Sequence, residues 1–352
     1  MAEHIEVAKA YVTIVPSLEG SQKTIAEELG ASGSAAAKTA GEEAGQEFGN
    51  SLATGLKATA AVVASAMAVV AGAAVAAGKA FIDSANDVAA YGDTIQKECW
   101  EDDRFVRGIK EDGQVIGSKK DPEASMWLNP QSWSVISGLA SKEQAELALE
   151  SVHRELNTAY GVRVMAPSYV DHAFDGALAL LFNPSTKENG GIFCQPQGWI
   201  ILAEALMGHG NRAFEYFTES SPASQNDNAD VRKLEPYVHG QFTEANESPF
   251  HGRTHVHWLT GTASTCMVGC VEGICGMRPD LDGLWVCPTI PSDWKEMTMD
   301  KVFRGKKLHI TVKNPNGAES GFKEFYLNGV KLDQPYVAEK DMKDENEVVV
   351  IM

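Results

Sequence analysis

Hydrophobic residues follow a helical period through the middle of the chain and a β-type alternation near its end. Between residues 145 and 156 apolar side chains form one stripe, and Ser141 to Gln144 predict a capping box that begins this helix. We expect the helix to continue to Tyr160 and Gly161 to end it. The same period predicts three further helices, over residues 199–207, 212–218 and 260–276.

From Pro288 onward, β-branched and alternating runs indicate strands. Turn signals separate these runs at Arg304–Gly305, at residues 314–317 and at Asn328–Gly329. We therefore predict a small antiparallel β-sheet or sandwich over residues 288–352, which covers the helical part and carries no site.

The composition changes sharply near residue 97. The chain before it is rich in Ala, Gly, Ser and Glu, whereas all seven Trp lie after it. Such a change favours separate domains, which we place at residues 1–96, 97–287 and 288–352. Just after the first boundary, residues 104–107 and 114–116 predict the two arms of a short hairpin, with its turn at residues 111–113.

Two segments before residue 97 carry a recognisable pattern. Residues 5–15 alternate enough for a short strand that Pro16 ends. Residues 50–90 predict an Ala-rich helix, because Ala is the best helix former. Residues 58–78 are uncharged and long enough to span a membrane, but they contain no Leu, Ile or Phe. We therefore expect a self-packing helix rather than a membrane span.

Charge and cysteine content narrow the classes of function. The net charge of −18 repels nucleic-acid phosphates, which argues against DNA or RNA binding. The six cysteines form no C-x-x-C pair, and Cys266, Cys270 and Cys275 fall on one predicted helix. We interpret them as reduced core thiols rather than as metal ligands or a disulfide framework. This usage favours a cytoplasmic protein.

Two short polar segments could carry chemistry. Thr260-Gly261 stands at the start of an apolar helix, where free N–H groups and the helix dipole favour an anion. The alternative is an N-cap threonine without a ligand. Lys187, Glu188 and Asn189 precede two glycines, which predicts either a loop that reaches a sugar or a solvated turn. Four histidines could suggest a metal site, but we expect polar lining or core positions for them: His239, His251, His255 and His257.

The N-terminal part of the chain resembles the start of a phage tail tape-measure protein. The resemblance rests on residues 10–20 (Ala-Tyr-Val-Thr-Ile-Val-Pro-Ser-Leu-Glu-Gly), on the Ala/Gly-rich apolar helix, and on residues 87–95 (Asp-Val-Ala-Ala-Tyr-Gly-Asp-Thr-Ile). A generic Ala-rich helix is the alternative interpretation of the same segment.

Five segments after residue 97 resemble, in order, the C-terminal half of the cellobiose and cellodextrin phosphorylases, which are inverting sugar phosphorylases. They are residues 127–133 (Trp-Leu-Asn-Pro-Gln-Ser-Trp), 187–193 (Lys-Glu-Asn-Gly-Gly-Ile-Phe), 235–242 (Glu-Pro-Tyr-Val-His-Gly-Gln-Phe), 257–262 (His-Trp-Leu-Thr-Gly-Thr) and 276–294. The resemblance implies a fold that is mainly α with a C-terminal β domain. Its helical part would be half of an (α/α)6 barrel of six helical hairpins.

The same resemblance implies an activity. It is the phosphorolysis of a β-linked glucose disaccharide or oligosaccharide to α-glucose 1-phosphate with inversion. Inorganic phosphate is the co-substrate, and no cofactor or metal is implied. A general base is not required, because phosphate is already an anionic nucleophile, unlike the water of an inverting hydrolase. A pocket of donor groups that holds the phosphate takes the place of the base.

The resemblance also assigns roles to individual residues. Thr260 and Gly261 match the family's phosphate-binding pair. Gln195 stands where many members have a phosphate-binding histidine, and it can donate to phosphate but adds no charge. Lys187 and Gln241 match residues that contact sugar hydroxyls, and Glu188, in the same loop as Lys187, joins the predicted sugar-binding set.

Two parts of the family's active site have no counterpart in this sequence. These are the general acid, which lies in a Trp-Asn-Asp type motif upstream of the Lys187 loop, and an upstream arginine that contacts phosphate. We therefore expect a truncated or chimeric gene product that is inactive alone. Exposed helix faces predict self-association or a homodimer. The alternatives are a phage tail-associated structural or carbohydrate-binding protein and a chimeric product of sequence assembly.

Overall fold

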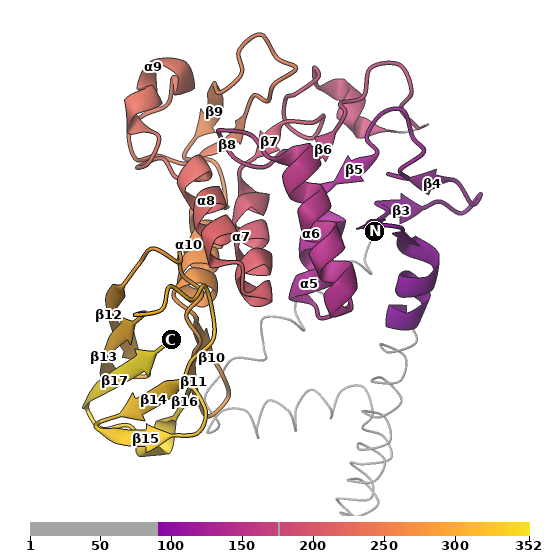
Figure 1. Cartoon of the computed structure of the whole chain (residues 1–352). Helices are drawn as coiled ribbons and strands as arrows, with labels where there is room; N and C mark the ends of the chain where they lie inside the picture. Colours follow the sequence, from indigo (N-terminus) through magenta and orange to yellow (C-terminus); the bar gives the residue numbers. More distant parts are fainter. Residues whose placement is uncertain (1–90, 175–176) are drawn as a thin grey trace, which may run out of the picture. The chain divides into compact units, whose positions relative to one another are not determined.

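A computed structural model describes residues 91–174 and 177–352 (Figure 1). These residues belong to one compact unit, Ala90–Met352. The strand predicted at residues 5–15, the Ala-rich helix and nearly all of the tape-measure resemblance lie outside the described residues and stay predictions. In the described part of the chain, no helix is long and apolar enough to cross a membrane.

Helix α7 (Gln195–Met207) is the centre of the helical layer. It packs against α5 (Leu128–Ile136), α8 (Gly210–Ser220) and α10 (Thr262–Val268), and α6 (Lys142–Leu156) packs against α5. Because α7 has neighbours on several sides, its sequence is apolar nearly all round. Figure 1 shows these helices grouped on one side of the C-terminal strands.

The ends of two helices test the predicted start and stop signals. The Ser141–Gln144 capping box is present at the start of α6, with both reciprocal hydrogen bonds. The predicted end is wrong, because α6 stops at Leu156 and residues 158–161 form a tight turn instead. In that turn the Thr158 hydroxyl donates to the Gly161 carbonyl, so the local side-chain bond competes with the helix. Gly208 ends α7 in the left-handed conformation, with φ of 88°.

The helix predicted over residues 260–276 consists of two parts. The α-helix α10 is followed at once by a π-helical segment, η3 (Gly269–Ile274). Both parts lie against α7 at very close range, because a Cβ added to Gly198 would lie 2.1 Å from the Thr265 carbonyl carbon. Glycine at position 198 therefore sets the spacing between α7 and α10.

Short strands and single helical turns connect the long helices. The strands form three antiparallel pairs: β1 (Trp100–Glu101) with β2 (Arg104–Phe105), β3 (Gly108–Ile109) with β4 (Val115–Ile116), and β5 (Met126–Trp127) with β6 (Met165–Ala166). The predicted hairpin is right in its second arm, β4, and in its turn at residues 110–114. Its first arm is wrong, because β3 pairs with β4, whereas Arg104–Phe105 pairs with β1. The remaining short elements are η1 (Leu178–Leu181), η2 (Asn226–Asn228), α9 (Ala229–Arg232) and η4 (Glu339–Asp341).

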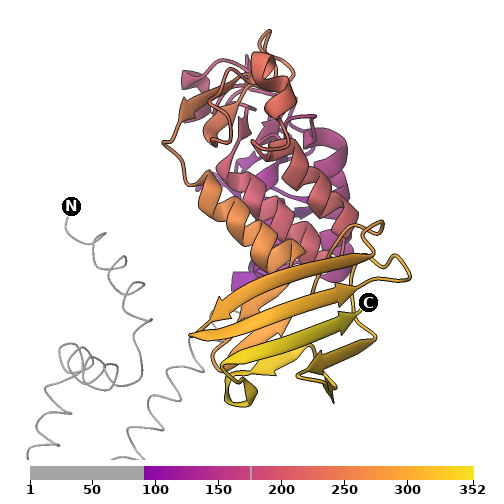
Figure 2. The ribbon, with the colours of Figure 1, turned by 90° about the vertical axis from the view of Figure 1, so that its left-hand side faces the viewer.

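A five-stranded sheet dominates the C-terminal part (Figure 2). Its order is β12-β13-β17-β14-β15, and the strands are β12 (Glu296–Phe303), β13 (Lys306–Lys313), β14 (Glu324–Leu327), β15 (Val330–Leu332) and β17 (Glu345–Ile351). The predicted turns at Arg304–Gly305 and Asn328–Gly329 are confirmed, because each pair has positive φ angles and joins two adjacent strands. The antiparallel prediction holds for every pair except β13 and β17, which are parallel.

A second, three-stranded sheet packs with the first. It contains β10 (Met277–Pro279), β11 (Gly283–Val286) and β16 (Tyr336–Ala338), so two of its strands precede Pro288. Side chains of both sheets, such as Leu284 and Ile310, belong to one core cluster that also includes α7 residues. The described residues therefore form a mixed α/β structure rather than a mainly α one. Strands of two residues have too little alternation to be recognised in a sequence.

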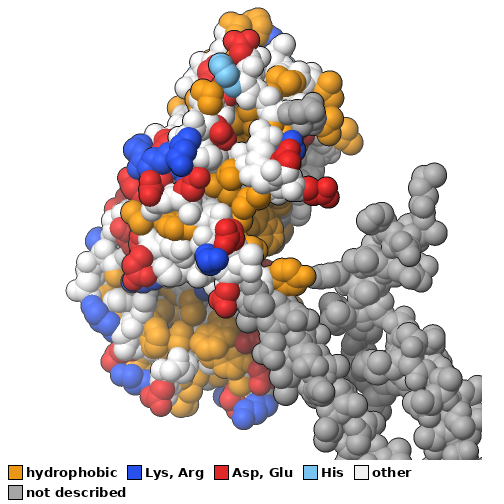
Figure 3. All heavy atoms as spheres, turned by 90° about the vertical axis from the view of Figure 1, so that its right-hand side faces the viewer, with side chains coloured by type: hydrophobic (Ala, Val, Ile, Leu, Met, Phe, Trp, Pro, Cys, Tyr) orange, Lys and Arg blue, Asp and Glu red, His pale blue; other side chains and the backbone are white. Residues whose placement is uncertain are grey.

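Apolar side chains also reach the surface of the described residues. A pocket of about 510 Å³ is lined mainly by apolar groups, which include Ile95, Phe105, Trp133 and Trp199. Figure 3 shows hydrophobic side chains gathered on one face of the molecule, between patches of charged ones. The partial (α/α)6 barrel and the predicted self-association stay predictions.

Candidate functional site

A small antiparallel sheet holds the segments that carry the predicted site. Its order is β7-β8-β9, and the strands are β7 (Ile192–Phe193), β8 (Gly240–Thr243) and β9 (Thr254–His257). Helix α7 follows β7 directly, and α10 follows β9 after a short loop. Two helix N-termini therefore leave the same sheet, at the same end of the helical layer (Figure 1).

The predicted phosphate-binding residues lie at these two helix starts. Gln195 is the first residue of α7, and Gly261 is the N-cap of α10. The two residues are neighbours, because a Cβ added to Gly261 would lie 3.4 Å from the Gln195 side-chain nitrogen. The Thr265 hydroxyl also donates to the Gln195 carbonyl at 2.8 Å and ties the two helices together. The structure therefore brings Gln195 and Gly261 together, although they are 66 residues apart in sequence.

Thr260 completes this group. Its hydroxyl oxygen accepts the Thr262 N–H at 3.1 Å and is hydrogen-bonded to the Thr262 hydroxyl. Thr260 is half-buried and Gly261 is exposed, so the group is open to an incoming anion. The next N–H groups of an α-helix's first turn have no intrahelical partner and are available to such a ligand.

The Lys187 loop is held in one conformation by buried contacts. Lys187 has a φ of 44°, a left-handed conformation that a lysine seldom adopts. The Asn189 side chain, 1% exposed, donates to the Tyr169 and Phe182 carbonyls at 3.0 and 2.9 Å. Gly191 is required because a Cβ there would lie 2.7 Å from the Lys187 backbone nitrogen. These contacts explain the Lys-Glu-Asn-Gly-Gly sequence as a rigid loop rather than a solvated turn.

The three predicted sugar-binding residues lie near this sheet, and no hydrogen bond or ion pair joins their side chains in the described residues. The Lys187 ammonium is 5.0 Å from the centre of the Phe182 ring and 5.9 Å from that of Phe242, which lies on β8. Gln241 is the neighbour of Phe242 and is half-buried, and its carbonyl accepts the Cys194 N–H. Glu188 is exposed, and no hydrogen bond or ion pair involves its side chain within residues 91–174 and 177–352.

A buried arginine near Gln195 was not predicted from the sequence. Arg232 is only 5% exposed, and its Nη1 has no hydrogen-bond partner among the described residues. It interacts electrostatically with the Cys194 thiol, next to Gln195, and burial lowers its pKa below the ordinary value. The pKa of the neighbouring His239 is also lowered, by burial and by this guanidinium. No sequence signal pointed to Arg232, because it lies in the one-turn helix α9 without a recognisable motif.

Strained backbone and exposed aromatic side chains frame the same site. Tyr237, Val256 and Trp258 have φ angles of 62°, 58° and 65°. Such values cost about 1–3 kcal/mol each, and a β-branched valine there is a genuine outlier. Tyr237 and Trp258 are 72% and 74% exposed, and the Trp258 ring nitrogen donates to Glu235. Exposed aromatic rings beside a donor-rich site are suited to stacking on a sugar face.

The histidines and carboxylates of this region form separate pairs. The His255 ring stacks on Phe242, with centroids 4.8 Å apart, and its Nε2 lies 2.6 Å from the buried Glu244. His257 is exposed. Across residues 91–174 and 177–352, no group of three or more His, Cys, Asp or Glu side chains is placed to hold a metal ion.

Comparisons with known proteins show what this chain is similar to. The sequence profile described as Glycosyl hydrolase 94 superfamily, catalytic domain, matches residues 57–276, and so begins inside the segment that resembles a tape-measure protein. An N,N′-diacetylchitobiose phosphorylase of Vibrio furnissii is 33% identical over 74% of this chain and 32% of its own length. A solabiose phosphorylase of Paenibacillus borealis is 30% identical over 68% of this chain and 31% of its own length. A cellobionic acid phosphorylase of Neurospora crassa is 32% identical over 62% and 28%, so the chain spans about a third of these curated relatives.

Proposed function

Because the chain belongs to the Glycosyl hydrolase 94 superfamily, we propose that it carries the phosphate- and sugar-binding side of a glycoside phosphorylase active site. The observation that supports this most directly is the proximity of the Gln195 side chain to Gly261. It places a side-chain amide beside the N-terminus of α10, where the Thr260 hydroxyl adds a further polar group. Two helix N-termini and neutral donors favour an anion that is exchanged during turnover.

The reaction follows from what such a site can hold. A phosphate oxygen attacks the anomeric carbon of the sugar, and a new C–O bond forms on the face opposite the glycosidic oxygen. The glycosidic C–O bond breaks, and the leaving oxygen takes a proton from a general acid. The products are a sugar 1-phosphate with inverted configuration and the shortened acceptor. Thr260, Gly261 and Gln195 orient the phosphate for this attack and need not remove a proton.

The sugar is held by the second group of residues. Lys187 and Gln241 present a charge and an amide from the loop before β7 and from β8, and Glu188 is free to accept from a hydroxyl. We propose a β-linked disaccharide or oligosaccharide of glucose as substrate, as in the cellobiose type. The names of the relatives include chitobiose, solabiose and cellobionic acid, so the donor and acceptor sugars require a direct test.

Turnover by this chain alone should be very low. Glu244 and Glu235, two carboxylates near the β7-β8-β9 sheet, are already paired with His255 and Trp258. Glu188 is unpaired in the described residues, but we assign it to the sugar, so it is not our general acid. Protonation of the leaving oxygen contributes about a hundredfold to ten-thousandfold in typical enzymes. The proposal is therefore a binding half-site whose chemistry requires an acid from elsewhere in a complete enzyme.

Phosphate binding tests the site directly. Titration calorimetry with inorganic phosphate should give saturable binding to the full chain, and Thr260→Val should weaken it by about tenfold, since it removes a hydroxyl without changing the shape. The matched control is Thr298→Val, which alters an exposed threonine on β12 and should bind like the parent chain. Equal binding by the parent and Thr260→Val would contradict the assignment.

A second variant tests the charge at position 195. Gln195→His introduces the ionisable ring that many family members carry, and phosphate affinity should then rise as the pH falls below the histidine's ordinary pKa of about 6.5. In the parent chain, Gln195 should cause no such rise in phosphate affinity as the pH falls.

Release of sugar 1-phosphate measures the activity itself. Purified chain is incubated in phosphate buffer with cellobiose, cellotriose and N,N′-diacetylchitobiose, and each sugar 1-phosphate is quantified. We expect phosphate binding without turnover. Rapid turnover would show that a carboxylate of this chain serves as the acid, and loss of both binding and turnover would overturn the proposed function.

A further inference from the structure

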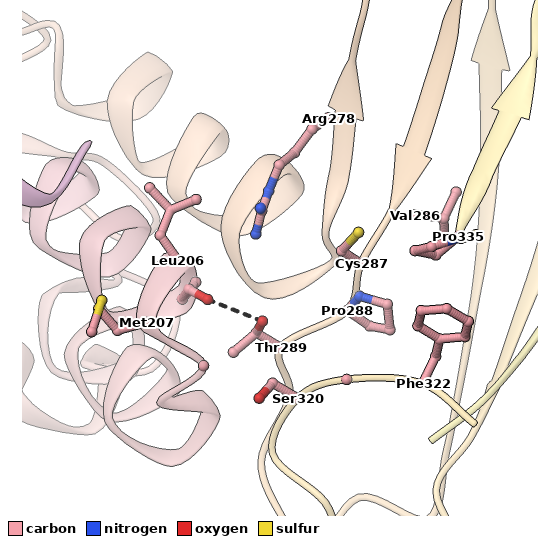
Figure 4. Close-up of a pocket in the computed structure, with 13 residues that line it drawn as sticks. Leu206, Met207, Arg278, Val286, Cys287, Pro288, Thr289, Ser320, Phe322 and Pro335 are labelled. Atoms are coloured by element: carbon pink, nitrogen blue, oxygen red, sulfur yellow. Dashed lines mark hydrogen bonds between the residues drawn. The ribbon is translucent and has the colours of Figure 1, made fainter. Parts of the chain in front are cut away.

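A separate cavity lies at the other end of α7, where the helical layer meets the sheets (Figure 4). Its volume is about 300 Å³, which is enough for a small organic molecule. Three segments enclose it: residues 205–208 at the end of α7, residues 286–289 after β11, and residues 320–322 before β14. None of the predicted site residues lines this cavity.

The cavity has one charged side chain in its wall. Arg278, on β10, is the only charged residue among those that line it, and no acidic side chain faces it there. In the described part of the chain, Arg278 makes no ion pair with a carboxylate. Its Nε donates to the Glu272 carbonyl at 2.9 Å, which fixes the side chain and leaves the terminal nitrogens without a protein partner among the described residues. Figure 4 shows the guanidinium directed toward the end of α7.

The chain has 48 acidic residues and a net charge of −18, yet no carboxylate among the described residues pairs with the half-buried Arg278. A guanidinium in a partly enclosed wall attracts an anion more strongly than an exposed one, because water screens it less. Of the carbonyl groups near the end of α7, that of Ala205 accepts from the Gly208 N–H and the Thr289 hydroxyl, so it is not a partner of the guanidinium.

The remaining walls are mostly apolar. Leu206, Met207, Phe322 and Pro335 surround the space, and the Ser320 hydroxyl and Cys287 thiol add weak polar groups (Figure 4). A phosphate dianion prefers several cationic or N–H donors, whereas this cavity offers one guanidinium. An apolar body with a single carboxylate matches both the walls and the charge.

We propose that this cavity is a binding site for a small organic monocarboxylate with a compact apolar body, and that Arg278 is its counter-charge. The site is independent of the proposed phosphorylase function. It also gives a role to Arg278, which lies in the resembling segment of residues 276–294.

Benzoate is a suitable probe, with benzamide as its neutral counterpart. Saturation-transfer NMR with the full chain should show benzoate binding at millimolar concentration and little benzamide binding. Arg278→Gln should weaken benzoate binding by about tenfold or more, since a charged hydrogen bond is lost. Lys340→Gln removes the same charge from an exposed site outside the cavity and should leave benzoate binding unchanged. Equal binding by Arg278→Gln, or no binding by the parent chain, would overturn the proposal.

A measurement on the unaltered chain covers the case in which Arg278→Gln fails to fold. Cys287 lines the cavity and Cys99 does not, and both are free thiols. Benzoate should slow the alkylation of Cys287 by N-ethylmaleimide several-fold and leave the rate at Cys99 unchanged, as followed by peptide mass spectrometry. Identical Cys287 rates with and without benzoate would contradict occupancy of this cavity.

Discussion

The C-terminal five-stranded sheet and the small β7-β8-β9 sheet differ in the length of their strands and in where backbone strain occurs. In the first, β12 and β13 pair over eight residues, and every second side chain of β13 points into the core. In the second, the strands are two to four residues long, and positive φ angles occur at Val256 and Trp258. In the larger sheet such angles lie in the turns between strands, at Arg304–Gly305 and Asn328–Gly329, and not within a strand.

We interpret this difference as a difference in role: the larger sheet stabilises the fold, and the smaller sheet holds the proposed site. In the larger sheet, alternation, turn residues and packing all favour the same arrangement, as expected where stability is the main requirement. Around the smaller sheet, a valine and a tryptophan adopt left-handed angles, and the Arg232 guanidinium lacks a partner at Nη1 in the described residues. Such local conflicts are typical of functional sites.

The largest effect should come from the core of the larger sheet. Phe325 on β14 is fully buried, so Phe325→Ala should lower the free energy of unfolding by about 3–5 kcal/mol. The control is Val330→Ala on the adjacent strand, where the side chain is 63% exposed and the change should stay within about 0.5 kcal/mol. Urea unfolding followed by circular dichroism measures both, and similar losses for the two variants would contradict the distinction.

The next largest loss of stability is expected at the crossing of α7 and α10, next to the proposed phosphate site. Gly198→Ala should cost about 2 kcal/mol, because its methyl group would overlap the Thr265 backbone and push the helices apart. The same movement separates Gln195 from Gly261, so phosphate affinity should fall as well. Gly108→Ala is the control, since nothing lies within 4 Å of a Cβ there. Calorimetry should show weaker phosphate binding for Gly198→Ala only.

A smaller, pH-dependent effect is expected at the end of α8. Burial raises the pKa of Glu219 to about 7, and its Oε2 has no partner in the described residues. The folded state therefore keeps this proton more tightly than the unfolded state. Its stabilising contribution is complete below the ordinary value of 4.5 and is lost as the pH rises through about 7.

Replacement of the Glu219 carboxyl group tests whether its pKa is raised in the folded protein. At pH 8, Glu219→Gln should be more stable than the parent chain by about 1 kcal/mol after solvent screening is considered, and the gain should vanish at pH 4. Thermal unfolding at several pH values measures it, with the exposed Glu296→Gln as control. A gain that is the same at pH 4 and pH 8 would argue against a raised pKa.

The smallest effect on stability is expected where function should change most. Trp258 is 74% exposed, so Trp258→Ala should alter the free energy of unfolding by less than about 0.5 kcal/mol. Loss of its ring should nevertheless weaken the binding of cellobiose or N,N′-diacetylchitobiose, measured by saturation-transfer NMR. Unchanged sugar binding would assign the exposed ring another role.

The sequence predicted regular elements well and strained ones poorly. The Ser141 capping box and the turns at Arg304–Gly305 and Asn328–Gly329 each depend on a few adjacent residues, and all three are found. The end of α6 was missed because the Thr158 turn competes locally with the helix. The parallel pairing of β13 with β17 depends on contacts far apart in sequence, which a local pattern does not encode.

The site shows the same division. The resemblance identified Gln195, Thr260 and Gly261, and the Gln195 side chain lies close to Gly261 in the structure. It identified neither Arg232 nor the exposed Trp258 ring, because a buried charge without a partner is recognised only when its surroundings are known. The cavity beside Arg278 could not be predicted either, because segments distant in sequence form its walls.

The position of β17 determines when the larger sheet can form during synthesis. This strand is central in the sheet, yet the ribosome makes it after the other four. Until then, the β12–β13 and β14–β15 hairpins have no strand between them, and each presents an open edge. The nascent chain should therefore depend on chaperones at this stage, and a truncation that removes Glu345–Ile351 should leave both hairpins prone to aggregation.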